Sequence, residues 1–260
     1  CYDWRRRYRR IGKTDKSSFT MKFFKWNNVR LILMIALMVF LYSFTSMRNE
    51  HRKLTKSMVV FTDDSNPFIK QETVNKLLIE NKTDASAIQK VDLDLNRLEK
   101  SINSNPMIEK SEVFVSIDGV LKAVVKQKTP IARMFNDEGS FYIDYQGGMM
   151  PVSDEFTARV PIVSGEINKV NQDEFNKLLR FVYDDDFLKK NIIGIQITPS
   201  GSIKMLNRNF DYEIEFGQTV NIERKFKNYK AFYQKTVVDS SLYKYKKINL
   251  TFTQQVVCTK

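Results

Sequence analysis

The sequence predicts an α+β protein with one N-terminal transmembrane helix, then two helices on a three-stranded sheet, then a mixed β domain with flanking helices. Three observations predict this architecture. Residues 31–47 carry no charge, residues 57–126 read as strand, helix, helix, strand, strand, and residues 131–260 contain several short alternating apolar segments.

The uncharged stretch LILMIALMVFLYSFTSM at 31–47 would form a helix roughly 25 Å long, near the thickness of a hydrocarbon core. Residues 1–30 carry ten Lys or Arg against two Asp, whereas Arg48, Arg52 and Lys53 follow the span. The positive-inside rule therefore predicts a cytoplasmic N-terminus. The apolar core is longer than that of a secretory signal and lacks an Ala-x-Ala site, so we expect a retained anchor. The alternatives are a cleaved signal and a buried helix of a soluble core.

The basic character of the chain belongs mainly to its N-terminal tail. The formal net charge is +12, and ten minus two gives +8 for residues 1–30 alone. The Arg-rich and aromatic run at 4–10 could bind RNA or anionic lipid, but a solvated topology signal explains it as well, and we predict no nucleic-acid partner. Because the chain opens with Cys1, Met21 is a better native start, and residues 1–20 carry none of the functional argument.

The cysteines and the single histidine restrict the possible chemistry. Cys1 and Cys258 would lie on opposite sides of the membrane, which excludes a disulfide within one chain. His51 stands in a charged stalk beside the membrane span. Any Ser-His-Asp or Cys-His site would need this one imidazole, so we expect no such catalysis.

Residues 57–126 predict the small α+β layer. We expect a strand at 57–61, helices at 69–81 and 93–103, and a hairpin with strands at 113–117 and 121–126. Pro106 would end the second helix, and Asp118-Gly119 would supply a two-residue turn with positive φ.

Residues 105–113 (NPMIEKSEV) and 120–132 (VLKAVVKQKTPIA) are similar to the FtsQ/DivIB family of bacterial division proteins. That family has a strand ending in Glu-Arg-x-Pro-x-Ala. This chain keeps Pro130 and Ala132, but Gln127-Lys128 replaces Glu-Arg. Two further departures are Met107 in place of Trp and Ser111 in place of Ala.

The resemblance covers nearly the whole chain from Met21, and the order of elements resembles a POTRA domain. It implies four parts. These are a cytoplasmic tail at 1–30, a transmembrane helix at 31–47, a stalk and POTRA domain at 48–130, and an FtsQ-type β domain at 131–260.

Within residues 131–260 we expect a hairpin around 136–139, a helix at 174–183 and strands at 192–198, 202–206 and 210–216. Residues 142–148 and 160–165 resemble the family's Val-Asp-x-x-Gly turn and its Leu-Pro segment.

Two acidic clusters could suggest metal or general-acid chemistry. Asp184-Asp185-Asp186 reads as a loop, and Asp211, Glu213 and Glu215 alternate with apolar residues as the solvated face of a strand. The sequence has no Gly-rich phosphate loop, Gly-x-Ser-x-Gly, His-Glu-x-x-His or Cys-x-x-Cys. We therefore predict a non-enzymatic protein without catalytic residues, cofactor or metal.

The C-terminal region carries the functional prediction. Residues 247–257 would form a terminal edge strand, whose free backbone groups can accept another chain. The alternative is an edge merely blunted by Thr251, Thr253 and the lysines. In the resemblance, Asn249-Leu250-Thr251-Phe252 occupies the place of an Asp-Leu-Arg-Tyr motif, which implies docking of the coiled-coil division proteins FtsB and FtsL. The predicted partner-binding residues are Tyr229, Tyr233, Ile248, Leu250, Thr251, Phe252 and Thr253.

The resulting hypothesis is a single-pass inner-membrane scaffold at the division septum, with periplasmic domains that bind FtsB/FtsL-like proteins. The resemblance also admits the septal peptidoglycan synthase complex as a partner. The alternatives are a membrane-anchored cell-wall enzyme and a POTRA-type export component.

Overall fold

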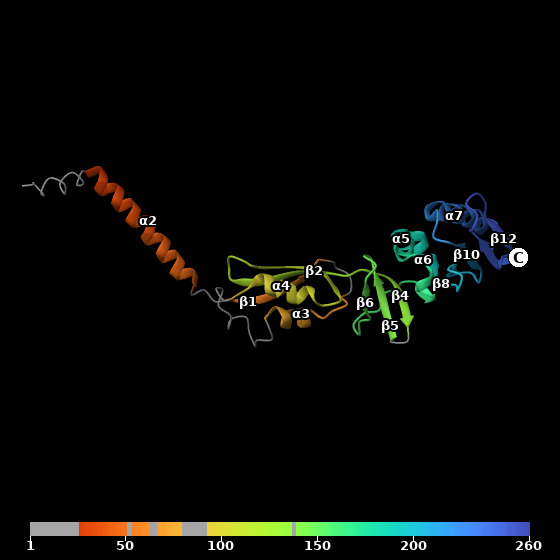
Figure 1. Cartoon of the computed structure of the whole chain (residues 1–260), viewed down its shortest axis with the longest axis horizontal. Coiled ribbons are helices and arrows are strands. Elements are labelled where there is room, and N and C mark those ends of the chain that lie inside the picture. Colours follow the sequence, from red (N-terminus) through yellow and green to blue (C-terminus); the bar gives the residue numbers. More distant parts are fainter. Residues whose placement is uncertain (1–25, 51–53, 63–66, 80–92, 137–138) are drawn as a thin grey trace, which may run out of the picture. The chain divides into compact units, whose positions relative to one another are not determined.

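The computed structural model describes residues 26–50, 54–62, 67–79, 93–136 and 139–260. The predicted α+β class is confirmed, because one apolar N-terminal helix precedes a mixed set of strands and helices (Figure 1). Residues 1–25 of the predicted basic tail at 1–30 lie outside the described residues, as does His51, and residues 26–30 belong to the first described helix.

The apolar helix is α2 (Trp26–Glu50). Among the described residues, its segment Asn28–Met47 is the one helix long and apolar enough to cross a membrane. Its large apolar side chains are exposed, with Leu31 at 59 % and Phe40 at 65 %. A helix that is apolar on all sides and not packed in a protein core suits lipid, which suggests a single-pass anchor.

The two-helix, three-stranded layer is present in the structure. Its strands are β1 (Lys56–Phe61), β2 (Ile108–Val115) and β3 (Val120–Gln127), in the order β1-β3-β2. β1 runs parallel to β3, and β2 runs antiparallel to it. The helices are α3 (Gln71–Leu78) and α4 (Leu95–Asn103), and their buried Val74, Leu98 and Ile102 share a core with Val59 and Ala123.

The predicted turn between β2 and β3 was wrong in one detail. Of Asp118 and Gly119, only Gly119 has a positive φ, of 79°. The Ser116 N–H donates to Val120 O at 2.9 Å and Gly119 N–H to Ser116 O at 3.0 Å, so the turn spans four residues. A single left-handed position is enough for this longer turn, and glycine supplies it without strain.

The second sheet has nine strands, in the order β12-β11-β10-β9-β8-β7-β4-β5-β6. Their bounds are β4 (Pro130–Asn136), β5 (Gly139–Asp144), β6 (Met149–Pro151), β7 (Ile162–Gly165), β8 (Ile192–Ile197), β9 (Ile203–Asn207), β10 (Glu213–Gly217), β11 (Lys247–Asn249) and β12 (Val257–Thr259). The pairs β4–β7, β7–β8 and β10–β11 are parallel.

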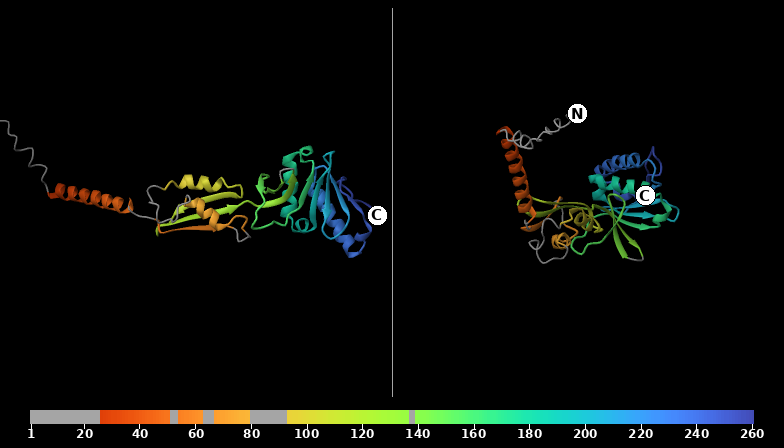
Figure 2. Two further views of the ribbon diagram at one scale, coloured as in Figure 1. Left: turned by 90° about the horizontal axis from the view of Figure 1, so that it is seen from below. Right: turned by 60° about the vertical axis from the view of Figure 1, so that its left-hand side comes forward.

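Helices pack against this sheet, as Figures 1 and 2 show for the C-terminal strands. They are α5 (Gln172–Asp184), α6 (Asp186–Asn191) and α7 (Ile222–Val238), with short 3-10 turns η3 (Ile167–Lys169) and η4 (Leu242–Lys244). In α5, Phe175, Leu178 and Val182 recur at helical spacing and are buried. In β10, Ile214 and Phe216 alternate with polar residues and enter the same core.

Two expectations for the second sheet were wrong. The strand expected over 247–257 stops at Asn249, and the chain returns as β12 only at Val257. The Asn249 Oδ1 accepts the Thr251 N–H at 2.8 Å, which closes a turn directly after β11. The aspartates expected in a loop instead link α5 to α6, because Asp185 caps α6 by accepting the N–H groups of Phe187 and Leu188 at 3.1 Å.

Phe68 connects the end of the first sheet with the start of the second. Its N–H donates to Gln127 Oε1 at 2.7 Å, and its carbonyl accepts the Ser153 hydroxyl. Its ring packs edge-on against Tyr142, with the centroids 6.3 Å apart. Phe68, Tyr142 and Met150 form a small buried cluster, so the connection is a packed joint.

The turn between β5 and β6 is held by a buried carboxylate. Asp144 Oδ1 accepts the N–H groups of Gln146 at 2.9 Å and Gly148 at 2.8 Å, and Oδ2 lies 3.0 Å from Lys128 Nζ. The Asp144 side chain is 2 % exposed. Lys128 therefore serves as the cationic partner of this turn.

Candidate partner-binding edge

β12 forms one edge of the nine-stranded sheet. It pairs with β11 in an antiparallel register that places Cys258 opposite Ile248, Val257 opposite Asn249 and Thr259 opposite Lys247. Among the described residues, no strand pairs with the other side of β12. Val257 is 41 % exposed and Thr259 is also exposed, so a row of backbone donors and acceptors at this edge is open to another chain.

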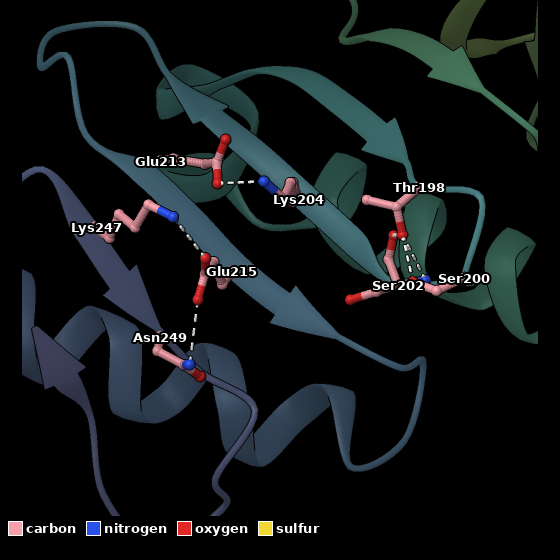
Figure 3. Close-up of polar contacts among 8 residues, drawn as sticks. All are labelled: Thr198, Ser200, Ser202, Lys204, Glu213, Glu215, Lys247 and Asn249. Atoms are coloured by element: carbon pink, nitrogen blue, oxygen red, sulfur yellow. Dashed lines mark hydrogen bonds and ion pairs between the residues drawn. The ribbon is translucent and has the colours of Figure 1, made fainter.

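The strands behind this edge present a polar face crossed by ion pairs (Figure 3). Lys204 Nζ lies 2.7 Å from Glu213, and Lys247 Nζ lies 3.2 Å from Glu215. The Asn249 side-chain amide donates to the second oxygen of Glu215 at 3.2 Å. The hydrogen bond to Glu213 raises the pKa of Lys204 above its usual value. Glu213 and Glu215 of β10 neutralise lysines on the neighbouring strands β9 and β11, and these ion pairs hold together the strands next to the edge.

The β8–β9 turn in Figure 3 is a hydroxyl-capped turn on the same sheet. The Thr198 Oγ1 accepts the Ser202 N–H at 3.1 Å and lies 2.9 Å from the Ser200 hydroxyl. Gly201 takes φ +77°, and a Cβ there would lie 2.7 Å from the Lys169 carbonyl. The turn is closed by its own side chains, so we assign it a structural role.

The segment 250–256 joins β11 to β12 and is anchored at two points. The Leu250 N–H donates to Glu215 O at 2.8 Å, and its side chain is 1 % exposed. The Asn228 amide of α7 donates to Thr253 O at 3.0 Å. Between these anchors Phe252 is 53 % exposed, so an aromatic ring stands free beside the edge.

The structure divides the predicted partner-binding residues into two groups. Tyr229, Ile248 and Leu250 are core residues, each at most 1 % exposed, and Tyr233 is half-buried. They can support the edge but offer little or no surface to a partner. Thr251 and Phe252 are exposed and Thr253 is half-buried, so contact with a partner remains a prediction for these three.

Tyr229 belongs to a buried hydrogen-bonded network. Its hydroxyl lies 2.7 Å from that of Tyr212 and accepts the Asn207 amide at 3.1 Å. Burial raises the pKa of Tyr229 to about 12, and it also raises the pKa of Tyr212. Tyr233 packs on Phe187, with the ring centroids 4.9 Å apart. The aromatic face of α7 therefore holds the helix on the sheet.

Sequence reasoning missed Lys225 and the true edge strand. Lys225 is 1 % exposed, and its Nζ donates to the carbonyls of Phe216 at 2.9 Å and Gln218 at 2.8 Å. Nothing in its local sequence distinguishes it from the exposed Lys227. The edge strand had a signal, because Asn is rare within strands and Asn249 interrupts an otherwise strand-like run.

The acidic clusters do not converge into a metal site in the described part of the chain, where no three His, Cys, Asp or Glu side chains come together. Asp185 instead pairs with Lys230 of α7. Burial acts to raise the pKa of Asp185, but the hydrogen bonds from Lys230 and from backbone N–H groups outweigh it and hold that pKa below its usual value. The predicted absence of catalysis and cofactor remains a prediction.

Comparison with known proteins places the second sheet in a family. A family model described as FtsQ/DivIB, C-terminal related, matches residues 129–259. No curated protein matches the chain. The match covers both the nine-stranded sheet and the edge strand β12.

Proposed function

Since the chain belongs to the family of FtsQ/DivIB C-terminal related proteins, a cell-division family that is generally non-enzymatic, we propose that it is a divisome scaffold. In this proposal α2 anchors it in the inner membrane with its N-terminus in the cytoplasm. The domain at 48–130, taken as a POTRA domain, and the domain at 131–260 then extend into the periplasm at the septum.

The observation that carries the proposal is the open edge at β12. An extended segment of a partner can add to this edge through main-chain hydrogen bonds, and its alternate side chains then face opposite sides of the sheet. The partner side chains on one side of the sheet would extend the core face that contains Ile248 and Cys258. Those on the other side would extend the polar face that contains Lys247 and Glu215. Phe252 would supply an apolar contact next to the new strand.

The proposed partners are FtsB/FtsL-like single-pass coiled-coil proteins, with the septal peptidoglycan synthase complex as a further one. A partner anchored in the same membrane meets the edge at a raised effective concentration, so a small interface is sufficient. This accounts for function by tethering without a catalytic step.

Photo-crosslinking in living cells tests the edge. A photoreactive amino acid at Phe252 or Thr259 should capture a small single-pass coiled-coil protein. The matched control is Met149, which is 71 % exposed on β6, the opposite edge of the same sheet. Capture from Met149 with none from Phe252 or Thr259 would show that the docking edge has been assigned wrongly.

A point variant gives a quantitative test. Phe252→Ala should weaken binding of the captured partner about tenfold, the loss expected for an interface aromatic worth about 1–2 kcal/mol. Because Phe252 is exposed, the thermal unfolding of the chain should be unchanged. Cell-wall hydrolysis by the purified chain, lost in Asp185→Asn, would instead support the enzyme alternative.

A further inference from the structure

The three-stranded sheet has one covered face and one open face. Ala123 and Val125 of β3 are fully buried, with Val59 beside them on the same face. The alternate residues point the other way, and there Met58 is 45 % exposed and Phe114 is 42 % exposed. Apolar side chains thus remain in solvent on the open face.

These side chains gather at the end of the sheet that carries the β2–β3 turn. The register places Met58 and Phe114 on either side of Lys122, and Lys56 lies opposite Val120 at the end of the strands. Ile117, in the turn itself, is 92 % exposed, at a position where polar residues or glycine are usual. We call Lys56, Met58, Phe114, Ile117 and Lys122 the tip surface.

The chain links the tip surface to the membrane anchor. Four residues, 51–54, lie between Glu50, the last of α2, and Thr55, so these two Cα atoms are at most about 18 Å apart. The Thr55 N–H donates to Gly119 O at 2.8 Å, and its hydroxyl donates to Asp118 O at 3.0 Å. The turn that holds Ile117 is therefore at the end of the sheet tethered to α2. Lys126, near the other end of β3, is roughly 20 Å further along the strand.

We propose that the tip surface binds the surface of the lipid bilayer that holds α2, with Ile117, Met58 and Phe114 entering the headgroup region. Lys56 and Lys122 then face anionic headgroups such as phosphatidylglycerol. Asp118 is the one acidic residue of the turn at 116–119, and the linker before β1 adds Arg52 and Lys53, so the charge of this end suits an anionic surface. This contact is independent of the partner-binding edge.

Fluorescence in reconstituted vesicles tests the proposal with the full chain. An environment-sensitive label is attached at Ile117→Cys in a Cys1→Ser, Cys258→Ser background, in vesicles of phosphatidylcholine and phosphatidylglycerol. The label should shift to the blue and be quenched by brominated lipid. The matched control, the same label at Lys126→Cys, should stay in water. The pair Lys56→Gln and Lys122→Gln should lower the bound-to-free ratio of the tip about fivefold for each charge removed.

Three results would overturn the assignment. Equal quenching at positions 117 and 126, or quenching at neither, would mean that the tip has no preference for lipid. A shift that grows with protein density at fixed lipid composition would assign the tip to a second copy of the chain. A label that stays in water in pure lipid and is shielded only in native membranes would assign it to a protein partner. Circular dichroism of each variant confirms that the fold is retained.

Discussion

The buried Lys225 should make the free energy of unfolding depend on pH, and the substitution Lys225→Met should remove this dependence. The side chain is 1 % exposed, and its Nζ donates to the carbonyls of Phe216 and Gln218 and lies 4.5 Å from the Phe216 ring centre. Burial penalises the ammonium form and lowers the pKa of Lys225 below its usual value of 10.5.

The direction of this pH dependence is set by the number of protons that the folded and the unfolded chain bind. Below the lowered pKa both the folded and the unfolded chain hold the proton, and the folded state contains the buried charge. Between that pKa and 10.5 the folded state releases the proton while the unfolded state keeps it. The free energy of unfolding therefore rises with pH in this window, by at most about 1.4 kcal/mol per pH unit. Lys225→Met removes this contribution.

The assay is urea unfolding of the detergent-solubilised chain between about pH 7 and pH 9.5, followed by near-ultraviolet circular dichroism of the buried tyrosines. The difference between wild type and Lys225→Met should increase with pH. Lys227→Met, on the exposed side of the same helix, is the control and should leave the slope unchanged. A pH-independent difference between wild type and Lys225→Met would refute the reasoning.

Three further substitutions test the packing of the nine-stranded sheet and its turns. Gly165→Ala should lower the free energy of unfolding by about 3 kcal/mol, because its φ is +93° and a Cβ would lie 1.9 Å from Ile197 O; urea unfolding measures this. Lys128→Met should cost about 2 kcal/mol, because Asp144 keeps a buried charge without its cation, and a thermal melt shows it. Asn249→Ala should cost about 1 kcal/mol through loss of the turn after β11, seen as faster amide exchange in β11 and β12.

The first two of these predictions have a control in the chain. Gly139→Ala also carries a positive φ, of +133°, but no heavy atom lies within 4 Å of its Cβ, so only the backbone cost remains. Lys110→Met removes an exposed ion pair with Glu112 and should change little. If each control lost as much stability as its test variant, steric overlap and burial would not be the causes.

Much of the fold could be predicted because it is encoded locally. The alternation in β2 and β3, the helical spacing in α5 and the uncharged length of α2 each lie within one short segment. Such periodicity is independent of what the segment packs against, so the number and order of these elements were predictable.

The candidate site was less predictable, because its limits depend on distant contacts. β11 ends where Asn249 bonds to Thr251 and to Glu215 of β10, and no local pattern reveals the second contact. Apart from Asn249, the run from 247 to 257 has strand propensity, so the bend and the new edge strand β12 were missed. Lys225 is buried because its ammonium group donates to the backbone carbonyls of Phe216 and Gln218 at the end of β10. The sequence around Lys225 does not reveal this contact, because only the tertiary structure brings these carbonyls to it.

The parallel pairing of β1 with β3 determines how the chain bears mechanical load. The anchor leads into the start of β1, and the end of β3 leads directly into β4. A force applied between α2 and the second sheet pulls these parallel strands from opposite ends, so the pairs from Lys56–Val120 to Phe61–Val125 are sheared together. Shear loads all the hydrogen bonds between β1 and β3 at once, whereas peeling would break them one at a time. Optical-trap unfolding should need more force along this axis than when β1 is pulled away from β3 sideways.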